Sequence, residues 1–583
     1  MDKYNIYNLM SIKTWKEIDW PLAEKTISRL QQRIYKASLN NDTLKTHRLQ
    51  RRLILNELAR AIAVKRVTEL NRGRKTPGID RTIVTSQKEK LKLLKNLKLD
   101  GKSLPIRRVY ISKPGKREKR PLGIPSIEDR AKQMLVKLAL EPEWEAKFEP
   151  NSYGFRPGRS CHDAIRAIFL SLRGKKRYIL DADIDKCFDK IDHEKLLKKI
   201  GTTLPIENQI RSWLKSDILT INKDQGIISS KSESGTPQGG IISPLLMNIA
   251  LHGMENAIKK YYVEKLYNGN KNTPKRDRLK QVGVYRYADD FVITAKQSED
   301  IYNIQSYING WLELECGLTL SKEKTKIVPS TEGFEFLGFH IVTIISKNKY
   351  VTKIYISSKS KKRVLYKTRE TIQKNKAASS AQLIKQLNPI IVGWCNYFKY
   401  CECSKDFKQI EYSLFGQIRA WVFRRKSKGL RSEQKLKLKY FPPDTTITFN
   451  GTKHKGNWIL VGEDLDRRKR KKQVFLVYPS WVNSENYVKI KECSSPFDGN
   501  HIYWAQRSSR YGSFNATERK LIKKQYGKCN LCGLYFKPGD TLEKDHIKRI
   551  ADGGKDTISN LKMVHRHCHD IKTLKENSKS KPE

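Results

Sequence analysis

The sequence predicts a multidomain protein of the α+β class, and three observations indicate this. The chain has 583 residues, which is too many for one hydrophobic core, so about two to four domains are expected. Short β-prone runs alternate with helical runs between residues 105 and 345, whereas helical spacing dominates before and after them. Three of the ten Cys and four of the eleven His lie after residue 528, which marks the tail as a separate unit.

The first helical region spans residues 15 to 70. Leu30 and Ile34 lie four residues apart, as on one face of a helix, and NND at 40–42 interrupts the pattern. The mixed region follows, and YVTKIYI (350–356) is expected to be its last strand because it is rich in β-branched and aromatic residues.

A second helical region begins near residue 380, where Leu383, Leu387 and Ile391 repeat at helical spacing. The next region, 430–515, is rich in Pro, Gly and charge and has no clear period. It contains the densest basic run, DRRKRKK, and is expected to be linker-like. The tail domain is expected to begin near NATERK.

The charge of the chain indicates a polyanionic partner. There are 116 Lys plus Arg and 61 Asp plus Glu, so the formal net charge is +55. Such an excess destabilises a compact fold by self-repulsion unless a polyanion screens it, and nucleic acid is the expected partner, with a membrane surface as the alternative. No apolar run approaches the ~18 residues of a membrane span. The first residues lack the layout of a signal peptide, and the sparse Cys favour a reducing compartment.

Two neighbouring acids, Asp289 and Asp290, lie inside the apolar and aromatic run YRYADDFVI (285–293). A buried carboxylate is costly unless it is paired or bound to a metal. The flanking tetrapeptides VYRY and FVIT are β-prone, so we expect a hairpin with Ala288 and Asp289 at its tip. A divalent cation bound by the two acids would offset the cost of placing them in an apolar run. The alternative is an exposed acidic hairpin that balances the charge of nearby Lys.

A third acid is expected from a neighbouring strand, YILDADIDKCF (178–188). With a period of two, Asp181, Asp183 and Asp185 share one face of this strand. Strand and hairpin acids together could hold two Mg²⁺ ions ~4 Å apart, the arrangement that supports in-line phosphoryl transfer.

Seven blocks of the sequence, in order, resemble those of group II intron reverse transcriptases. YADD resembles the polymerase signature, and DADIDKCFDKIDH and SGTPQGGIISPLLMNIAL resemble two further palm blocks. YISKPGKREKRPLGIPSIEDR and NSYGFRPGRSCHDAI resemble the finger blocks, and GLTLSKEKTKIV and FEFLGFHI resemble the later palm blocks. The resemblance implies a right-hand polymerase with fingers and palm (86–350), preceded by a helical RNA-binding extension (1–85).

The resemblance also implies roles for individual palm residues. Asp183, Asp289 and Asp290 would be the metal acids, assisted by the Ile184 carbonyl. Phe188 would lie under the incoming sugar and exclude a 2′-hydroxyl, unless it is a core aromatic.

Other residues would bind the nucleotide. Gln238, Gly239 and Gly240 follow Pro237 in a turn, where glycines would let the backbone approach nucleotide and template. Lys113 and Arg120 would reach the triphosphate as charge-assisted donors. Asp185 stands where the family often has Lys. Asp181 and Asp192 are expected to be structural.

The helices that follow resemble the thumb and maturase segment of the family, expected at 351–440. Aromatic and basic residues interleave there, which suits stacking on unpaired bases and neutralisation of phosphates. Trp394 and Phe398 are expected in the core, and the basic run is expected to bind RNA. The residues concerned are Trp394, Tyr397, Phe398, Tyr400, Trp421, Arg424, Arg425, Lys426 and Lys428.

The tail (516–583) contains two pairs with metal-ligand spacing. Cys529 and Cys532 form the first pair, and His565 and Cys568 would complete a tetrahedral zinc site, with His567 as a competitor for His565. The stretch EKDHIKRIADGGKDTISNLKMVHRHCHDIKT resembles the ββα-metal site of HNH endonucleases. A zinc knuckle that only binds DNA is the alternative.

The HNH resemblance implies that His546 is the general base and that Asn560 holds its loop. Asp545 and His569 would bind the catalytic Mg²⁺, while the zinc is structural. The region 441–515 resembles the DNA-binding segment of the family.

We therefore interpret the chain as a group II intron-encoded protein. It would be an RNA-directed DNA polymerase with maturase and HNH endonuclease activities, and it would support retrohoming by target-primed reverse transcription. The expected partners are intron RNA, target DNA and dNTP substrates, with no membrane; a homodimer stays open. The expected location is cytoplasmic in a bacterium, or an organelle matrix or stroma. A maturase with a vestigial polymerase and an endonuclease on a polymerase scaffold are the alternatives.

Overall fold

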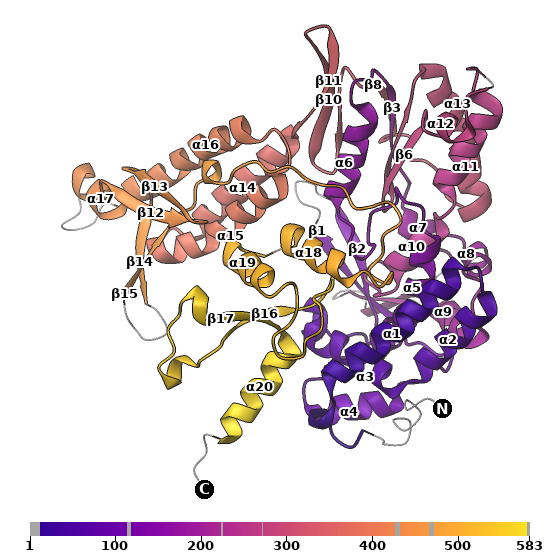
Figure 1. The fold of residues 1–583 in the computed structure, drawn as a ribbon, viewed down its shortest axis with the longest axis horizontal. Helices are drawn as coiled ribbons and strands as arrows, with labels where there is room; N and C mark the ends of the chain where they lie inside the picture. Colours follow the sequence, from indigo (N-terminus) through magenta and orange to yellow (C-terminus); the bar gives the residue numbers. More distant parts are fainter. Residues whose placement is uncertain are drawn as a thin grey trace.

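The computed structural model describes residues 12–112, 118–222, 226–231, 233–270, 272–425, 432–465, 471–512 and 514–579. Its elements form a mixed α+β arrangement with several sheets (Figure 1). None of the helices among these residues is both long and apolar enough to cross a lipid bilayer. Lys113, Lys426, Lys428 and most of the DRRKRKK run lie outside the described residues.

The N-terminal region is helical, as expected, and packs on one long helix of the polymerase region. The side chains of Asp19, Asp42 and Asn56 accept backbone N–H groups at the starts of three helices, which satisfies otherwise unpaired donors. The break expected at NND separates the first two of them. These helices are α1 (Trp20–Leu39), α2 (Thr43–Leu55) and α3 (Glu57–Lys65), and they pack against α5 (Ile127–Lys147).

The central sheet is antiparallel and has the strand order β6-β7-β3-β8. Its apolar residues face two different cores: Leu180 and Phe291 pack in the core that includes α13, whereas Ile179 and Val292 pack in the core that includes α6. The strands are β6 (Gly283–Tyr287), β7 (Asp290–Ala295), β3 (Tyr178–Asp183) and β8 (Lys326–Pro329), and the two helices are α13 (Ser298–Cys316) and α6 (Cys161–Leu172).

A second four-stranded sheet has the order β2-β1-β4-β5. A third sheet leads into the helices at 358–440, and its last strand covers the expected YVTKIYI. The strands of these two sheets are β1 (Ile106–Ser112), β2 (Lys119–Ile124), β4 (Ile218–Asn222), β5 (Gly226–Ser230), β9 (Phe334–Phe336), β10 (Phe339–Ser346) and β11 (Lys349–Ile356).

The helices after the third sheet are α14 (Ser358–Lys374), α15 (Ser380–Phe398), α16 (Ser404–Phe423) and α17 (Glu433–Tyr440). Phe398 is buried in their core and Trp394 packs beside it, with ring centroids 5.1 Å apart, which confirms the expected core positions. Trp421 is also buried, and the Arg425 guanidinium lies over its ring at 3.8 Å from the centroid. This aromatic is therefore not free to stack on a base.

The region after residue 441 differs from the linker-like expectation, because it is folded and packs on the polymerase region. Trp504 in α18 (His501–Tyr511) is 1% exposed, and a Cβ at Gly158 would lie 2.3 Å from its ring. The fully buried Asp163 accepts hydrogen bonds from Arg507 Nη2 at 2.6 Å and from the Ile490 backbone at 2.8 Å. The sequence shows no period here because two short hairpins and an irregular segment carry the burial.

The two hairpins pair β12 (Thr445–Phe449) with β13 (Thr452–Gly456) and β14 (Val461–Leu465) with β15 (Lys471–Phe475). The tail begins at a helix whose capping box joins Asn515 and Glu518, close to the expected NATERK start. It consists of α19 (Ala516–Lys524), the paired strands β16 (Leu542–His546) and β17 (Leu561–His565), and α20 (Arg566–Lys579). It packs against α1, where Lys537 Nζ donates to Ser28 Oγ at 2.6 Å.

Candidate functional site

The expected acidic hairpin is present. Strands β6 and β7 pair up to Tyr287 and Asp290, so Ala288 and Asp289 form the turn between them. Ala288 has a φ of +60°, a value suited to a tight two-residue hairpin turn. Asp183 is the direct cross-strand partner of Asp290, which places carboxylates from three positions at one end of the sheet.

A buried arginine holds this turn, and the sequence analysis did not identify it. Arg286 is 3% exposed, and its Nη1 donates to Asn248 Oδ1 at 2.9 Å and to the Ala288 carbonyl at 3.2 Å. Its Nη2 donates to Ser152 Oγ at 2.8 Å. On the other side, a Cβ at Gly154 would lie 2.3 Å from the Ala288 nitrogen, so only glycine fits there. The available signal was an Arg inside a strand that is otherwise apolar and aromatic.

The carboxylates repel one another. Burial, followed by the charges of Asp289, Asp183 and Asp181, raises the pKa of Asp290 to about 7. Burial also raises the pKa of Asp289, and it raises the pKa of Asp181 to about 6. The Lys324 ammonium contacts Asp183 Oδ2 and offsets part of this charge. A cluster of hard oxygen ligands with surplus negative charge has the chemistry that Mg²⁺ requires.

Of the three acids expected on one strand face, Asp181 and Asp183 share it and Asp185 does not. Asp181, expected to be structural, lines the same cavity as Asp183 and Asp290, a space of about 1050 Å³ that is also lined by residues of the third sheet. Asp185 does not continue the strand face: β3 ends at Asp183, and the Lys186 φ of +44° turns the chain. Asp185 instead pairs with Lys190 at 2.7 Å.

Phe188 lies in the short helix α7 (Cys187–Lys190) and is half-buried, with its ring 6.3 Å from the exposed Phe155 ring, edge to face. The loop with the PQGG residues is hydrogen-bonded to the backbone of Phe188, since the Thr236 N–H donates to the Phe188 carbonyl at 2.5 Å. Gly235 has a φ of +86°, and a Cβ there would lie 2.5 Å from the Asp189 carbonyl carbon.

Both PQGG glycines lie close against other protein atoms. Gly239 has a φ of +121°, and a Cβ there would lie 2.3 Å from the Gly123 carbonyl oxygen, while the Gln238 carbonyl accepts the Gly123 N–H at 2.6 Å. A Cβ at Gly240 would lie 2.6 Å from Ser243 Oγ. The loop is therefore joined to strand β2.

Arg120 is exposed on β2, and its charge contributes to lowering the pKa of Asp289 against the effect of burial. Lys113, the other expected donor, lies outside the described residues.

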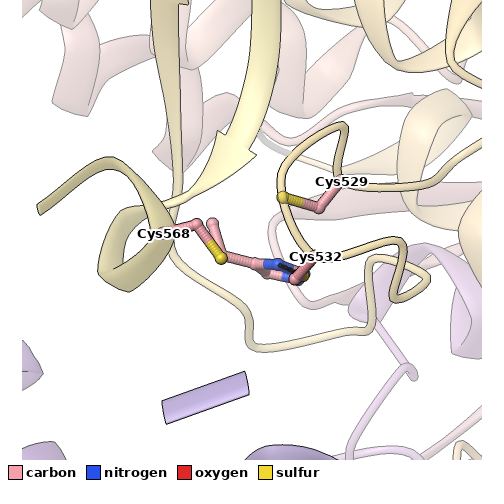
Figure 2. Close-up of side chains that lie close together, drawn as sticks. Cys529, Cys532 and Cys568 are labelled. Atoms are coloured by element: carbon pink, nitrogen blue, oxygen red, sulfur yellow. Dashed lines mark hydrogen bonds between the residues drawn. The ribbon is translucent and has the colours of Figure 1, made fainter. Parts of the chain in front are cut away.

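In the tail, four side chains form a compact metal-ligating cluster: Cys529, Cys532, His565 and Cys568 (Figure 2). Their ligand atoms lie within 4.8 Å of one another. His565 Nδ1 is 3.4 Å from Cys532 Sγ, and its Nε2 is 3.3 Å from Asp540 Oδ2, the outer contact that orients many ligating imidazoles. Three thiol sulfurs and one imidazole are the donor set of a structural zinc site.

His567, the competitor for His565, is not part of this cluster. Its ring stacks on that of His565, with centroids 5.0 Å apart and an interplanar angle of 8°. Burial lowers the pKa of His567 to about 3, which keeps the ring neutral. The strand β17 decides the choice, because His565 is its last residue and Cys568 follows one helical turn later on α20.

The remaining tail residues gather at the other end of β16. His546 Nε2 is 3.2 Å from Asp556 Oδ1. Asn560 holds the loop that follows His546, since its Nδ2 donates to the carbonyls of Lys548 and Lys555 at 2.9 Å, and its Oδ1 accepts the Lys548 N–H at 2.9 Å.

Asp545 and His569 come together, but two lysines, Lys572 and Lys562, pair with the Asp545 carboxylate. His569 Nε2 lies 3.7 Å from Asp545 Oδ1, whereas Lys572 Nζ donates to both Asp545 oxygens at 2.8 and 2.9 Å. Glu543, which the sequence analysis missed, lies 2.9 Å from His569 Nδ1 and forms a possible ligand group with His569 and Asp570. Its signal was its place two residues before Asp545 on the same strand face.

Four family profiles match the chain in order. Residues 15–97 match the N-terminal domain of reverse transcriptase, and residues 111–341 match reverse transcriptase (RNA-dependent DNA polymerase). Residues 361–441 match the group II intron maturase-specific domain, and residues 529–575 match HNH endonuclease.

Named relatives agree with these profiles. Protein YkfC of Escherichia coli K12 is 33% identical over 54% of this chain and 88% of its own length. The group II intron-encoded protein LtrA of Lactococcus lactis is 35% identical over 46% of this chain and 53% of its own. An uncharacterized 91 kDa protein in the cob intron of Schizosaccharomyces pombe is 30% identical over 61% of this chain and 51% of its own. The matched region thus spans about half the length of LtrA and of the Schizosaccharomyces pombe protein.

A telomerase structure from Candida albicans has a TM-score of 0.34 and 14% identity, over 58% of this chain and 63% of its own, and no argument rests on it. The profiles and the relatives agree on the same domain order. The chain belongs to the family of group II intron-encoded proteins, with reverse transcriptase, maturase and HNH endonuclease domains in one polypeptide.

Proposed function

We propose that the chain synthesises DNA on an RNA template at Asp183, Asp289 and Asp290. The observation that carries this proposal is the pairing of Asp183 with Asp290 across the sheet, next to the Asp289 turn, with the pKa of Asp290 raised to about 7 by burial and neighbouring acids. Mg²⁺ bound there would activate the primer 3′-hydroxyl and neutralise the leaving pyrophosphate. The Ile184 carbonyl is a candidate further ligand.

Other polymerase residues would bind and select the nucleotide. Phe188 would exclude a 2′-hydroxyl, and the hydrogen bond from Thr236 to the Phe188 backbone would fix the position of the ring. Gln238 and Gly239 would shape the nucleotide pocket by fixing their loop to Gly123 of β2. The glycines would not themselves offer a bare backbone surface to the nucleotide. Arg120 would bind the triphosphate, as would Lys113.

The maturase-specific domain implies binding to the intron's own RNA. The formal net charge of +55 supports this partner, because a highly basic surface gains affinity by releasing counterions from phosphates. We infer that the bound RNA is thereby helped to fold and splice, while the splicing chemistry belongs to the RNA.

We further infer that the tail nicks DNA. His546 would take a proton from the attacking water, and Asp556 would hold its imidazole in place. Asn560 would keep the His546 loop in one conformation through its three hydrogen bonds. Asp545 and His569 would hold Mg²⁺, which supplies charge stabilisation at the leaving 3′-oxygen. The Cys529, Cys532, His565 and Cys568 cluster would hold structural zinc.

Together these activities support target-primed reverse transcription. The ribonucleoprotein would bind a DNA target, nick one strand and extend the new 3′ end with the intron RNA as template. The intact acid cluster argues against a vestigial polymerase, and the ordered palm argues against a mere scaffold for the nuclease.

The test is a reaction of the reconstituted ribonucleoprotein with end-labelled target DNA and dNTPs. We expect a nicked strand first and then the same strand lengthened by intron complementary DNA. A separate primer-extension reaction on a plain RNA template serves as the control for polymerase activity alone. Nicking of the target DNA with no DNA synthesis in either reaction would support the scaffold alternative. Assisted splicing with neither nicking nor DNA synthesis would support the vestigial polymerase.

A further inference from the structure

A second cavity, of about 570 Å³, opens on helix α16 of the maturase-specific domain. Its walls are aromatic: Tyr412 and Phe415 come from α16, Trp458 comes from the segment between the two hairpins, and Tyr478 follows the second hairpin. Lys408 and Arg419 add positive charge. A volume of this size is typical of sites for small organic groups.

The cavity wall on α16 follows from the spacing of its residues. Lys408, Tyr412, Phe415 and Arg419 are separated by four, three and four positions, which places them on one stripe of a helix. Two aromatics therefore lie in the middle of the stripe with a cation at each end.

The opposite wall is held rigidly. The Trp458 ring centroid is 5.4 Å from those of Phe415 and Phe441, and Lys437 Nζ lies 4.6 Å from it. The Tyr478 hydroxyl donates to the Trp458 carbonyl. Trp458 is thus positioned before any ligand arrives, which reduces the entropy cost of binding.

Two of the aromatic rings in the wall are exposed. Tyr412 is 81% exposed and Trp458 is 37% exposed, although burial of such rings is favourable. Flat aromatic faces with flanking Lys and Arg are the features with which proteins bind unpaired bases, while duplex RNA keeps its base faces stacked and inaccessible.

The one acid in the wall, Glu411, indicates which part of a nucleotide enters. One of its oxygens, Oε2, accepts the Ser480 N–H at 3.0 Å. A carboxylate repels phosphate but can accept a hydrogen bond from the amino or imino group of a base. The base would therefore enter the cavity, and the phosphates would stay outside with Lys408 and Arg419.

We propose that this cavity binds an unstacked nucleobase from a single-stranded segment of RNA. The base stacks on the exposed Tyr412 and Trp458 rings, and Lys408 and Arg419 neutralise the adjoining phosphates. This inference rests on the proposed binding of intron RNA by the maturase-specific domain, and it assigns that binding a specific pocket.

The experiment is photocrosslinking of the full-length protein to short oligouridine that carries 5-iodouridine, a base that crosslinks to stacked aromatic rings. Peptide mapping should locate the crosslink at Tyr412 or Trp458. The same strand annealed to oligoadenosine should not crosslink there, because its bases are paired.

Three variants accompany the mapping. Tyr412→Ala should abolish the crosslink and weaken binding of the single strand by about five- to 150-fold, the range for loss of one base stack. Tyr412→Phe should keep both. Tyr302→Ala removes a tyrosine that is also highly exposed, on α13 and away from the cavity lining, and should change neither.

The outcomes separate this inference from the proposed function. If the wild-type chain fails to bind intron RNA at all, both are wrong. If it binds intron RNA but Tyr412→Ala binds single strands as well as the wild type and crosslinks map elsewhere, only the pocket is overturned. Equal crosslinking of single and double strands at Tyr412 would also overturn it, because a stacked base cannot enter.

Discussion

The palm and the tail each place acids for a catalytic cation, but lysines balance the acidic charge to different degrees in the two sites. In the palm, Asp290 and Asp289 lie near Asp183, and burial and mutual repulsion raise the pKa of both hairpin acids. In the tail, Lys572 donates to both oxygens of Asp545. The palm therefore keeps surplus negative charge even with Lys324 on Asp183, whereas in the tail two lysines, Lys572 and Lys562, contact the single carboxylate of Asp545.

The two sites also differ in what holds them. The palm hairpin is held by Arg286 and by a large apolar core on both sides of the sheet. The tail has a small core of its own, and three of the four members of its Cys/His cluster belong to it or pack on it. The palm should thus tolerate loss of its metal without unfolding, and the tail should not tolerate loss of zinc.

The largest expected effect is on the palm. Asp289→Ala combined with Asp290→Ala removes two of three carboxylates and should lower DNA synthesis by at least about a thousandfold, since roughly 4 kcal/mol of transition-state stabilisation depends on the bound cations. Primer extension on an RNA template measures this. Intron RNA binding and DNA nicking should be retained. Asp185→Asn is the matched control, because Asp185 lies beside the site yet pairs with Lys190 outside it; extension by the double variant at the control's rate would refute the assignment.

In the tail, two variants should separate fold from chemistry. Cys529→Ala breaks the metal cluster and should release zinc and unfold residues 516–579, because a structural zinc site supplies folding free energy. His546→Ala should keep zinc and lower nicking by about 10²- to 10⁴-fold, the typical contribution of a general base. Zinc content and hydrogen exchange over the tail measure the first effect, and a nicking assay measures the second. A folded, zinc-free Cys529→Ala tail would contradict the comparison.

Substrate selection should depend on the palm alone. Phe188→Ala removes the ring proposed to lie under the sugar and should raise ribonucleotide incorporation relative to deoxynucleotide by about ten- to 200-fold, the range for one steric contact in a pocket. Competition between the two nucleotides in primer extension gives the ratio. Nicking should not change. Unchanged discrimination would mean that Phe188 serves only to pack against its neighbours.

The two lysines test the charge comparison directly. Lys572→Met removes the closer of the two lysines that pair with Asp545 and should lower the Mg²⁺ concentration that half-saturates nicking by roughly fivefold, as expected for an ion pair worth about 1 kcal/mol. Lys324→Met frees Asp183 and should do the same for primer extension only, and by less, since Lys324 is the more exposed lysine. If either variant changes the Mg²⁺ requirement of the other activity, the sites are not independent.

The last prediction concerns the stability of the protein as a function of pH. The folded-state pKa of Asp290, about 7, lies above its ordinary value of 3.8, so the folded chain binds more protons than the unfolded chain between these values. Without divalent cations, the free energy of unfolding should therefore fall as pH rises from about 4 to about 7. Asp290→Asn should flatten this slope and stabilise the protein at pH 8. Thermal unfolding in the presence of a chelator measures the slope and the stability at pH 8. An unchanged slope in Asp290→Asn would show that the pKa of Asp290 is not raised in the folded chain.

Short-range patterns in the sequence predicted much of both sites. A period of two placed Asp181 and Asp183 on one strand face, and β-prone flanks with a two-residue tip predicted the Asp289 hairpin. Spacing also predicted the two zinc-ligand pairs. These features depend on residues that are neighbours along the chain, so strand periodicity and turn chemistry are sufficient to place them.

Only the tertiary structure decided the features that join distant segments. Arg286 meets Asn248 and Ser152, and Trp504 fills the space over Gly158. Lys572 reaches Asp545 because α20 packs on β16.

The same holds for the choice between His565 and His567, which depends on where β17 ends relative to the loop of Cys529 and Cys532. No local period records such contacts, because each is set by the packing of elements that lie far apart in the sequence. The sequence alone therefore determined which chemical groups are present and how neighbouring ones are spaced. Folding decided which of them meet and which charges are left unbalanced.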